Sequence, residues 1–196
     1  YHLYDQGEEL SSFDFGSKDL NGISAITKLI DLGVDSLKIE GRMKSDYYIA
    51  TVVRCNRNLI DDYYAGKEID YDYYNNELAK AENRLASTGF LFGDVTTNEQ
   101  LYDSKVTPTK EYVGIVLDYD EKTQIAKIEQ RNYFAPNDEI EFFGPHLANT
   151  SMIVNEIKDQ DNNVLDAARH PKQVVYFKVL FPVSKNDMIR LIRKEK

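Results

Sequence analysis

Residues 31–53, DLGVDSLKIEGRMKSDYYIATVV, contain the pattern that decides the fold of the first half of the chain. Segment 35–40 alternates apolar Leu37 and Ile39 with charged residues, which is the period of a β-strand with two distinct faces. Gly41 then allows the chain to turn. The stretch therefore predicts a strand followed by a loop and a helix.

A helix is expected on each side of this strand. Apolar residues at helical spacing predict a helix over 21–32, which Gly33 ends, and Ser45 is a suitable N-cap for a long helix over 46–65. The apolar stripe predicted for the long helix is Ile49, Val52, Val53, Leu59, Ile60 and Tyr63. The order helix, strand, helix is typical of the end of an α/β repeat, and one strand cannot make a sheet. We therefore expect the rest of the sheet to lie upstream, in a longer protein.

The rest of the chain changes in character along its length. Residues 71–88 predict a third helix ended by Gly89, and residues 94–109 lack strong periodicity and are interpreted as a linker. Short strands separated by turn-rich segments follow, and they predict a small closed β-barrel. Their expected ranges are 111–119, 123–130, 138–144, 151–157, 173–180 and 187–193. The fold class is thus α+β, with domains at 1–107 and 108–196, and Asn137 is expected at positive φ.

Composition restricts the classes of function. The net charge is −9, most of the acidic excess falls on residues 1–107, and neither part is a basic nucleic-acid footprint by bulk charge. The single cysteine excludes an internal disulfide and any multi-cysteine metal site made from this chain alone, and it favours a reducing, cytoplasmic setting. The sequence has no apolar run long enough for a membrane span, so no membrane partner is expected.

The loop after the predicted strand is the main candidate site. In a barrel of parallel strands the carboxyl ends of the strands carry catalysis, so Lys38 and Glu40, on one strand face, are the candidate catalytic pair. The alternative is a structural Lys–Glu pair. Arg42, Lys44 and the backbone amide of Ser45 meet a helix N-terminus and are candidates for binding a carboxylate or phosphate. The alternative there is a solvated basic loop.

Other residues with suitable chemistry give weaker signals. His2, His146 and His170 are isolated and lack metal-ligand spacing, and Cys55 is interpreted as inert packing. Arg84, which lies shortly before a Gly-terminated turn, is a candidate anion contact. No metal ligands are predicted.

One segment of the chain resembles a known family. Residues 17–61 are similar to the conserved segment of the collagenase-like peptidases, family thirty-two of the unclassified (U) peptidases. The elements that carry the resemblance are SKDL at 17–20, GVDSLKIEGR at 33–42, KS at 44–45 and YY at 47–48. Residues 82–94, ENRLASTGFLFGD, resemble a second segment of that family, and 111–193 match its C-terminal barrel at the level of fold only.

The resemblance implies a specific architecture and a set of partners. It implies that residues 1–107 end a TIM-like α/β barrel domain, and that residues 108–196 form a barrel similar to the second domain of elongation factor Tu. It also implies an iron–sulfur cluster whose cysteines are absent here, and Lys38, Glu40, Arg42 and Lys44 at the catalytic pocket. Many members act in RNA modification, including prephenate-dependent hydroxylation of the tRNA wobble uridine. A related subunit or a second copy of the chain is a further expected partner.

Three functional hypotheses follow. The first is the C-terminal part of an enzyme that modifies tRNA or other RNA, with the carboxylates of prephenate bound by Arg42 or Lys44. The second is a peptidase whose nucleophile or metal lies upstream, and the third is a non-catalytic binding module. In each case we expect this chain alone to be inactive in proteolysis and in RNA modification.

Overall fold

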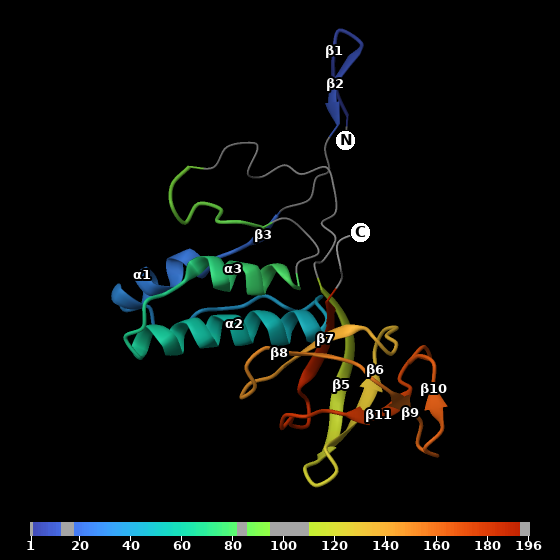
Figure 1. Cartoon of the computed structure of the whole chain (residues 1–196). Coiled ribbons are helices and arrows are strands. Elements are labelled where there is room, and N and C mark those ends of the chain that lie inside the picture. Colours follow the sequence, from blue (N-terminus) through green and yellow to red (C-terminus); the bar gives the residue numbers. More distant parts are fainter. Residues whose placement is uncertain (1, 13–17, 82–85, 95–109, 193–196) are drawn as a thin grey trace. The chain divides into compact units, whose positions relative to one another are not determined.

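The chain divides into two compact units, Tyr1–Pro108 and Thr109–Lys196. The structure is a computed structural model and describes residues 2–12, 18–81, 86–94 and 110–192 (Figure 1). Of the two units, the first contains the described helices and the second is built from strands. Among the described helices, none is long and apolar enough to cross a membrane.

The first unit is built around helices that match the predicted ranges closely. Its helices are η1 (Ile23–Ala25), α1 (Ile26–Asp31), α2 (Asp46–Tyr64) and α3 (Tyr71–Ala79). Ser45 caps α2, because its Oγ accepts the Tyr48 amide at 3.2 Å, and Gly33 and Gly66 both have positive φ after helix ends. The predicted helices over 21–32 and 46–65 are therefore confirmed.

The buried face of α2 differs from the predicted stripe. Tyr47, Thr51, Cys55 and Leu59 are buried at four-residue spacing, whereas Ile49 is 37% exposed and Val53 is 45% exposed. The buried side chains pack with those of α3, which lies beside α2 in Figure 1, and of η1. The choice of face follows from hydrogen bonds as well as hydrophobicity, since Cys55 donates to the Tyr74 carbonyl of α3 and Tyr47 donates to the carbonyl of Lys80, the C-cap of α3.

The strand predicted over 35–40 is wrong. These residues are described and form no strand, and Leu37 and Ile39 are each 38% exposed. An alternating sequence becomes a strand only when a neighbouring strand takes up its backbone hydrogen bonds, and the described residues supply none here.

The strands of the first unit are short. They are β1 (His2–Asp5), β2 (Glu8–Ser12), β3 (Asp19–Leu20) and β4 (Ala86–Ser87). β1 and β2 form an antiparallel hairpin, and β3 pairs with β4 in parallel. The third helix predicted over 71–88 is wrong beyond α3, because residues 86 and 87 pair with β3 instead.

The second unit is one curled antiparallel sheet, as Figure 1 shows. Its strands are β5 (Lys110–Asp120), β6 (Ile125–Gln130), β7 (Glu139–Phe143), β8 (Thr150–Ile153), β9 (Ile157–Lys158), β10 (Val164–Leu165), β11 (Val174–Lys178) and β12 (Met188–Ile192). They follow the order β10-β9-β11-β6-β5-β12-β7-β8. The predicted strands are confirmed, except that 151–157 divides into β8 and β9. In the described residues β8 and β10 are not paired, so the closed barrel is observed as a curled half-barrel.

The sheet encloses a continuous apolar core. Alternate residues of β6 and β11 face it, so Ala126, Ile128, Val175 and Phe177 are buried while their neighbours are only partly covered. Asn137 has φ +72°, as predicted, in the turn before β7, and its backbone amide donates to the Val154 carbonyl at 2.7 Å. Side-chain alternation therefore gives the sheet one core face and one outer face.

Gly144, just after β7, lies against a buried carboxylate, and a side chain there should destabilise the second unit. A Cβ at this position would come within 1.8 Å of Asp187 Oδ1. Asp187 is only 3% exposed, and its Oδ2 accepts the Ser184 amide at 2.7 Å, so the carboxylate cannot swing away freely. We expect Gly144→Ala to lower the free energy of unfolding by about 1–3 kcal/mol.

Hydrogen exchange of the second unit measures this effect. In an Asp187→Ala background the nearest remaining side-chain atom would be a Cβ at 3.5 Å, so Gly144→Ala should cost less than about 1 kcal/mol there. An equal cost in both backgrounds would show that the contact with Asp187 is not the cause.

Candidate functional site

Three of the predicted site residues line one hollow of the first unit. Lys38, Glu40 and Lys44 share a hollow of about 400 Å³ with apolar side chains of η1, α1 and α2. Its lining also includes the polar residues Asn21 and Asn56. A mixed apolar and polar lining of this size is typical of a small-molecule site. The loop that follows α1 therefore places a cationic and an anionic group beside an apolar surface.

Lys44 is held in place by two contacts. Its Nζ donates to Asp19 Oδ2 at 2.7 Å and lies 4.5 Å from the centre of the Tyr48 ring. Both partners of the ion pair are about four-fifths buried, with side chains 21% and 23% exposed. Asp19 offsets part of the positive charge, so Lys44 positions the loop as well as contributing to the hollow.

Lys38 and Glu40 are both exposed and do not form an ion pair with each other. The predicted alternative of a structural Lys–Glu pair is therefore wrong. Glu40 instead uses Oε1 to accept the Arg42 amide at 3.0 Å, which closes the turn at Gly41. Among the described residues Lys38 has no ion-pair partner, so its ammonium is available to an anionic ligand.

The other predicted contacts are not brought into the hollow. Arg42 is exposed and lies outside its lining, and the Ser45 hydroxyl is used as the α2 cap. Arg84 falls outside the described residues. The predicted convergence of Arg42, Lys44 and the Ser45 amide on one anion site is thus not observed as a single cluster.

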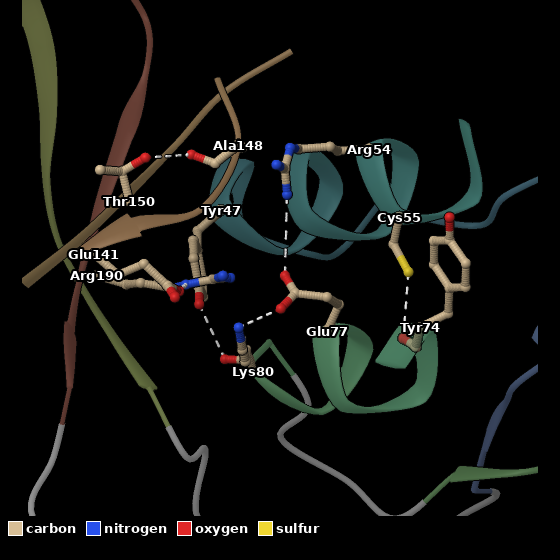
Figure 2. A network of polar contacts seen from close by, with 10 residues as sticks. All are labelled: Tyr47, Arg54, Cys55, Tyr74, Glu77, Lys80, Glu141, Ala148, Thr150 and Arg190. Atoms are coloured by element: carbon tan, nitrogen blue, oxygen red, sulfur yellow. Dashed lines mark hydrogen bonds and ion pairs between the residues drawn. The ribbon is translucent and has the colours of Figure 1, made fainter. Parts of the chain in front are cut away.

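A buried polar cluster between α2 and α3 was missed by sequence reasoning (Figure 2). Glu77 is 6% exposed, accepts a hydrogen bond from Lys80 Nζ and has Arg54 Nη1 at 4.0 Å. Tyr47 adds a hydrogen bond from its hydroxyl to the Lys80 carbonyl at 3.0 Å. These residues are separated by up to 33 positions, and only the Glu77–Lys80 spacing could have suggested a contact. The cluster neutralises a buried carboxylate and joins the two helices.

Cys55 belongs to the same helix interface and is not a nucleophile. Its Sγ donates to the Tyr74 carbonyl at 3.3 Å, and burial, reinforced by the charge of Glu77, raises the pKa of the thiol to about 12. The thiol therefore stays protonated near neutral pH. This confirms the interpretation of Cys55 as inert packing.

Metal ligation finds no support in the part of the chain that the structure describes. No group of three or more His, Cys, Asp or Glu side chains there could hold a metal ion. His2 Nδ1 lies 2.7 Å from Glu9 Oε1 across the β1–β2 hairpin, while His146 and His170 are exposed. The predicted absence of metal ligands in this chain stays a prediction.

The related proteins carry two kinds of name. "tRNA hydroxylation protein P1" of Bacillus subtilis (strain 168) is 44% identical over 187 residues, which cover 94% of this chain and 44% of the relative. "Collagenase" of Porphyromonas gingivalis is 31% identical over 166 residues, covering 81% of this chain and 45% of the relative. The chain thus spans less than half the length of these relatives.

Solved structures and family profiles complete the comparison. The crystal structure of the C-terminal domain of a U32 peptidase from Geobacillus thermoleovorans is 51% identical and covers 41% of this chain and 91% of that domain, with a TM-score of 0.41. The profile described as "Peptidase family U32" matches residues 1–101, and "Peptidase family U32 C-terminal domain" matches residues 108–190. The two profiles meet near the boundary between the two compact units. The chain belongs to peptidase family U32.

Proposed function

We propose that this chain is the C-terminal part of an RNA-modifying enzyme that hydroxylates a uridine of tRNA in a prephenate-dependent reaction. The observation that carries the proposal is the 44% identity, across 94% of the chain, to a protein named for tRNA hydroxylation. The same name recurs in relatives from Haemophilus influenzae and Escherichia coli, at 29% and 33% identity. tRNA is then the partner, and the cytoplasm is the compartment in which the enzyme acts.

The hollow of the first unit supports a role in binding a carboxylate. Lys38 is an exposed ammonium beside an apolar wall, which suits a small acid with a hydrocarbon body. Lys44 provides a second positive group at a fixed position, partly offset by Asp19. We propose that Lys38 and Glu40 contact the substrate, and that Lys44 contributes to its orientation.

An iron–sulfur cluster does not fit the residues of this chain. Such clusters are held mainly by cysteine thiolates, and the only cysteine is buried and bonded to a backbone carbonyl. No step of the reaction is therefore assigned to a cluster held by these 196 residues.

Nucleoside mass spectrometry tests the proposal. tRNA is taken from a strain that lacks the full-length gene and from strains complemented with the parent, Lys38→Ala or Glu40→Ala. We expect hydroxylated uridine to disappear on deletion, return with the parent, and fall at least tenfold with Lys38→Ala or Glu40→Ala. Lys67→Ala is the matched control, since Lys67 lies after α2, outside the hollow, and pairs with Asp62. An unchanged uridine profile in the deletion strain would reject the proposal.

A peptidase is the second candidate function. The observation in its favour is the 31% identity to a protein named collagenase. The described residues contain no cluster that could hold a metal, and the Cys55 thiol is protonated, so we propose that the nucleophile or metal lies outside the described residues. Collagen cleavage by the full-length protein, together with an unchanged uridine profile, would favour this function.

A further inference from the structure

A second hollow lies on the outer face of the second unit, where β6, β9 and β11 run side by side. Its volume is about 530 Å³, within the ordinary range of ligand sites, about 300–1,000 Å³. Tyr176 is one of the residues that line it. Because Val175 and Phe177 are buried in the core, the alternation of the strand directs Tyr176 to the outer face.

Lysine side chains flank this ring on both neighbouring strands. In the sheet register Tyr176 is directly opposite Lys127 of β6 and Lys158 of β9, so the three side chains form one row across the outer face. Lys178, two residues along β11, lies on the same face and also lines the hollow. The register thus places one aromatic residue between two lysines of the neighbouring strands, with a third lysine two residues along β11.

The carboxylates of the hollow are already engaged. Asp159 accepts the amides of Asp161 and Asn163 and the side-chain Nδ2 of Asn163, each at 2.9 Å, and so closes the turn between β9 and β10. Glu156 lies 3.0 Å from Lys158 Nζ. Among the described residues Lys127 and Lys178 have no ion-pair partner. In the lining, Lys158 and Lys178 balance Glu156 and Asp159, and Lys127, opposite Tyr176 and just outside the lining, adds one positive charge.

Amide side chains complete the lining. Asn155, Gln160 and Asn162 border the hollow, and each can donate and accept hydrogen bonds at the edge of a planar heterocycle. Asn162 is held at φ +67° by the turn that Asp159 closes. A ring for stacking, amides for base edges and ammonium groups for phosphates are the groups that single-stranded RNA requires.

We propose that this hollow binds single-stranded RNA, with one base stacked on Tyr176 and the adjoining phosphates held by Lys178 and by Lys127 beside the hollow. The inference deepens the proposed function, on which it rests, because it places an RNA-binding surface on the second unit. The phosphate contacts are few, so binding is expected to be weak and to depend on the stacked base.

Fluorescence anisotropy of the 196-residue chain tests the inference, with a fluorescein-labelled 12-nucleotide single-stranded RNA of mixed sequence at low salt. Tyr176→Ala is expected to weaken binding about 5- to 150-fold, which corresponds to the loss of one base–aromatic stack. Tyr176→Phe keeps the ring and should bind as the parent does. Tyr133→Ala is the matched control, because this tyrosine is 53% exposed and lies outside the hollow.

The charge contribution is measured separately. Lys178→Gln should weaken binding and reduce the slope of log K against log salt by about 0.7, the value for one phosphate contact with a single strand. Circular dichroism of each variant identifies any loss of folding. If Tyr176→Ala is unfolded, the comparison of Tyr176→Phe and Lys178→Gln with the parent provides the test.

The inference is overturned if the parent chain does not bind the RNA, if a folded Tyr176→Ala binds as tightly as the parent, or if an acidic peptide of equal charge binds more tightly than the RNA. Its failure is distinct from that of the proposed function. If deletion of the gene changes the uridine profile but Tyr176→Ala does not change RNA binding, only the inference about the hollow is rejected. If Tyr176→Ala weakens RNA binding but deletion of the gene leaves the uridine profile unchanged, only the proposed hydroxylation is rejected.

Discussion

Replacing Glu141 with leucine is expected to lower the free energy of unfolding of the second unit by about 3–5 kcal/mol. Arg190 has no exposed surface, and its Nε donates to Glu141 Oε1 at 2.5 Å (Figure 2). The guanidinium carbon lies 4.5 Å from the centre of the Phe143 ring. Removing the carboxylate takes away the anion to which the buried guanidinium donates, and the protein interior cannot replace the water that would solvate this cation.

The sheet register explains why this pair forms. Arg190 of β12 and Glu141 of β7 are directly opposite each other, and a shift of register just before Arg190 separates it from the regular alternation of the strand. Ile189 and Arg190 are consequently both buried although they are adjacent. The irregularity buries the charged side chain of Arg190, and the carboxylate of Glu141 compensates its positive charge.

A double-mutant cycle separates the pair from its surroundings. Arg190→Met alone should also cost several kcal/mol, whereas the combination with Glu141→Leu should lie within about 2 kcal/mol of the parent, because no buried charge then remains. The partly exposed pair Glu156 and Lys158 is the matched control, with an expected coupling below about 1 kcal/mol. Hydrogen exchange of β5, β7 and β12 is the measurement. A cost below 1 kcal/mol for Glu141→Leu would contradict the prediction.

Local signals account for the parts of the fold that could be predicted. The cap at Ser45, the stop at Gly66 and the helical period between them lie within one segment, so α2 could be located from neighbouring residues alone. The same holds for Asn137, whose positive φ follows from the turn sequence. β9 and β10 have two residues each, which is too short for an alternation of apolar and polar residues to be recognised in the sequence. A segment forms a strand only when a neighbouring strand pairs with it. Residues 35–40 have no such neighbour among the described residues, so their alternating sequence was mistaken for a strand.

The candidate site likewise has one part that could be predicted from the sequence and one part that could not. Lys38, Glu40 and Lys44 line one hollow because seven residues of one loop hold them, and that proximity could be read from the sequence. The partner of Lys44, Asp19, is 25 positions away, and Arg190 is 49 positions from Glu141. Contacts at such separations depend on tertiary packing, so the sequence predicted which residues carry charge but not which charges neutralise one another.

Alkaline pH is expected to destabilise the first unit through Cys55. In the folded chain burial raises the pKa of this thiol from its usual 9 to about 12. Between these values the unfolded chain releases the proton and the folded chain keeps it. The stabilisation is therefore complete below pH 9 and is lost as the pH rises toward 12, by about 1.4 kcal/mol for each pH unit.

Hydrogen exchange of α2 and α3 between pH 9 and 10.5, compared in the parent and in Cys55→Ala, isolates this contribution. Over this interval the parent should lose about 2 kcal/mol more than the variant, because alanine has no proton to release. Burial and the hydrogen bond to Asp62 also raise the pKa of Tyr74, so Cys55→Ala should keep part of the alkaline sensitivity. Tyr74→Phe, combined with Cys55→Ala, should remove that part as well. Equal slopes in the parent and in Cys55→Ala would mean that the thiol titrates alike in the folded and unfolded chains, and that its burial between the helices does not hold the proton.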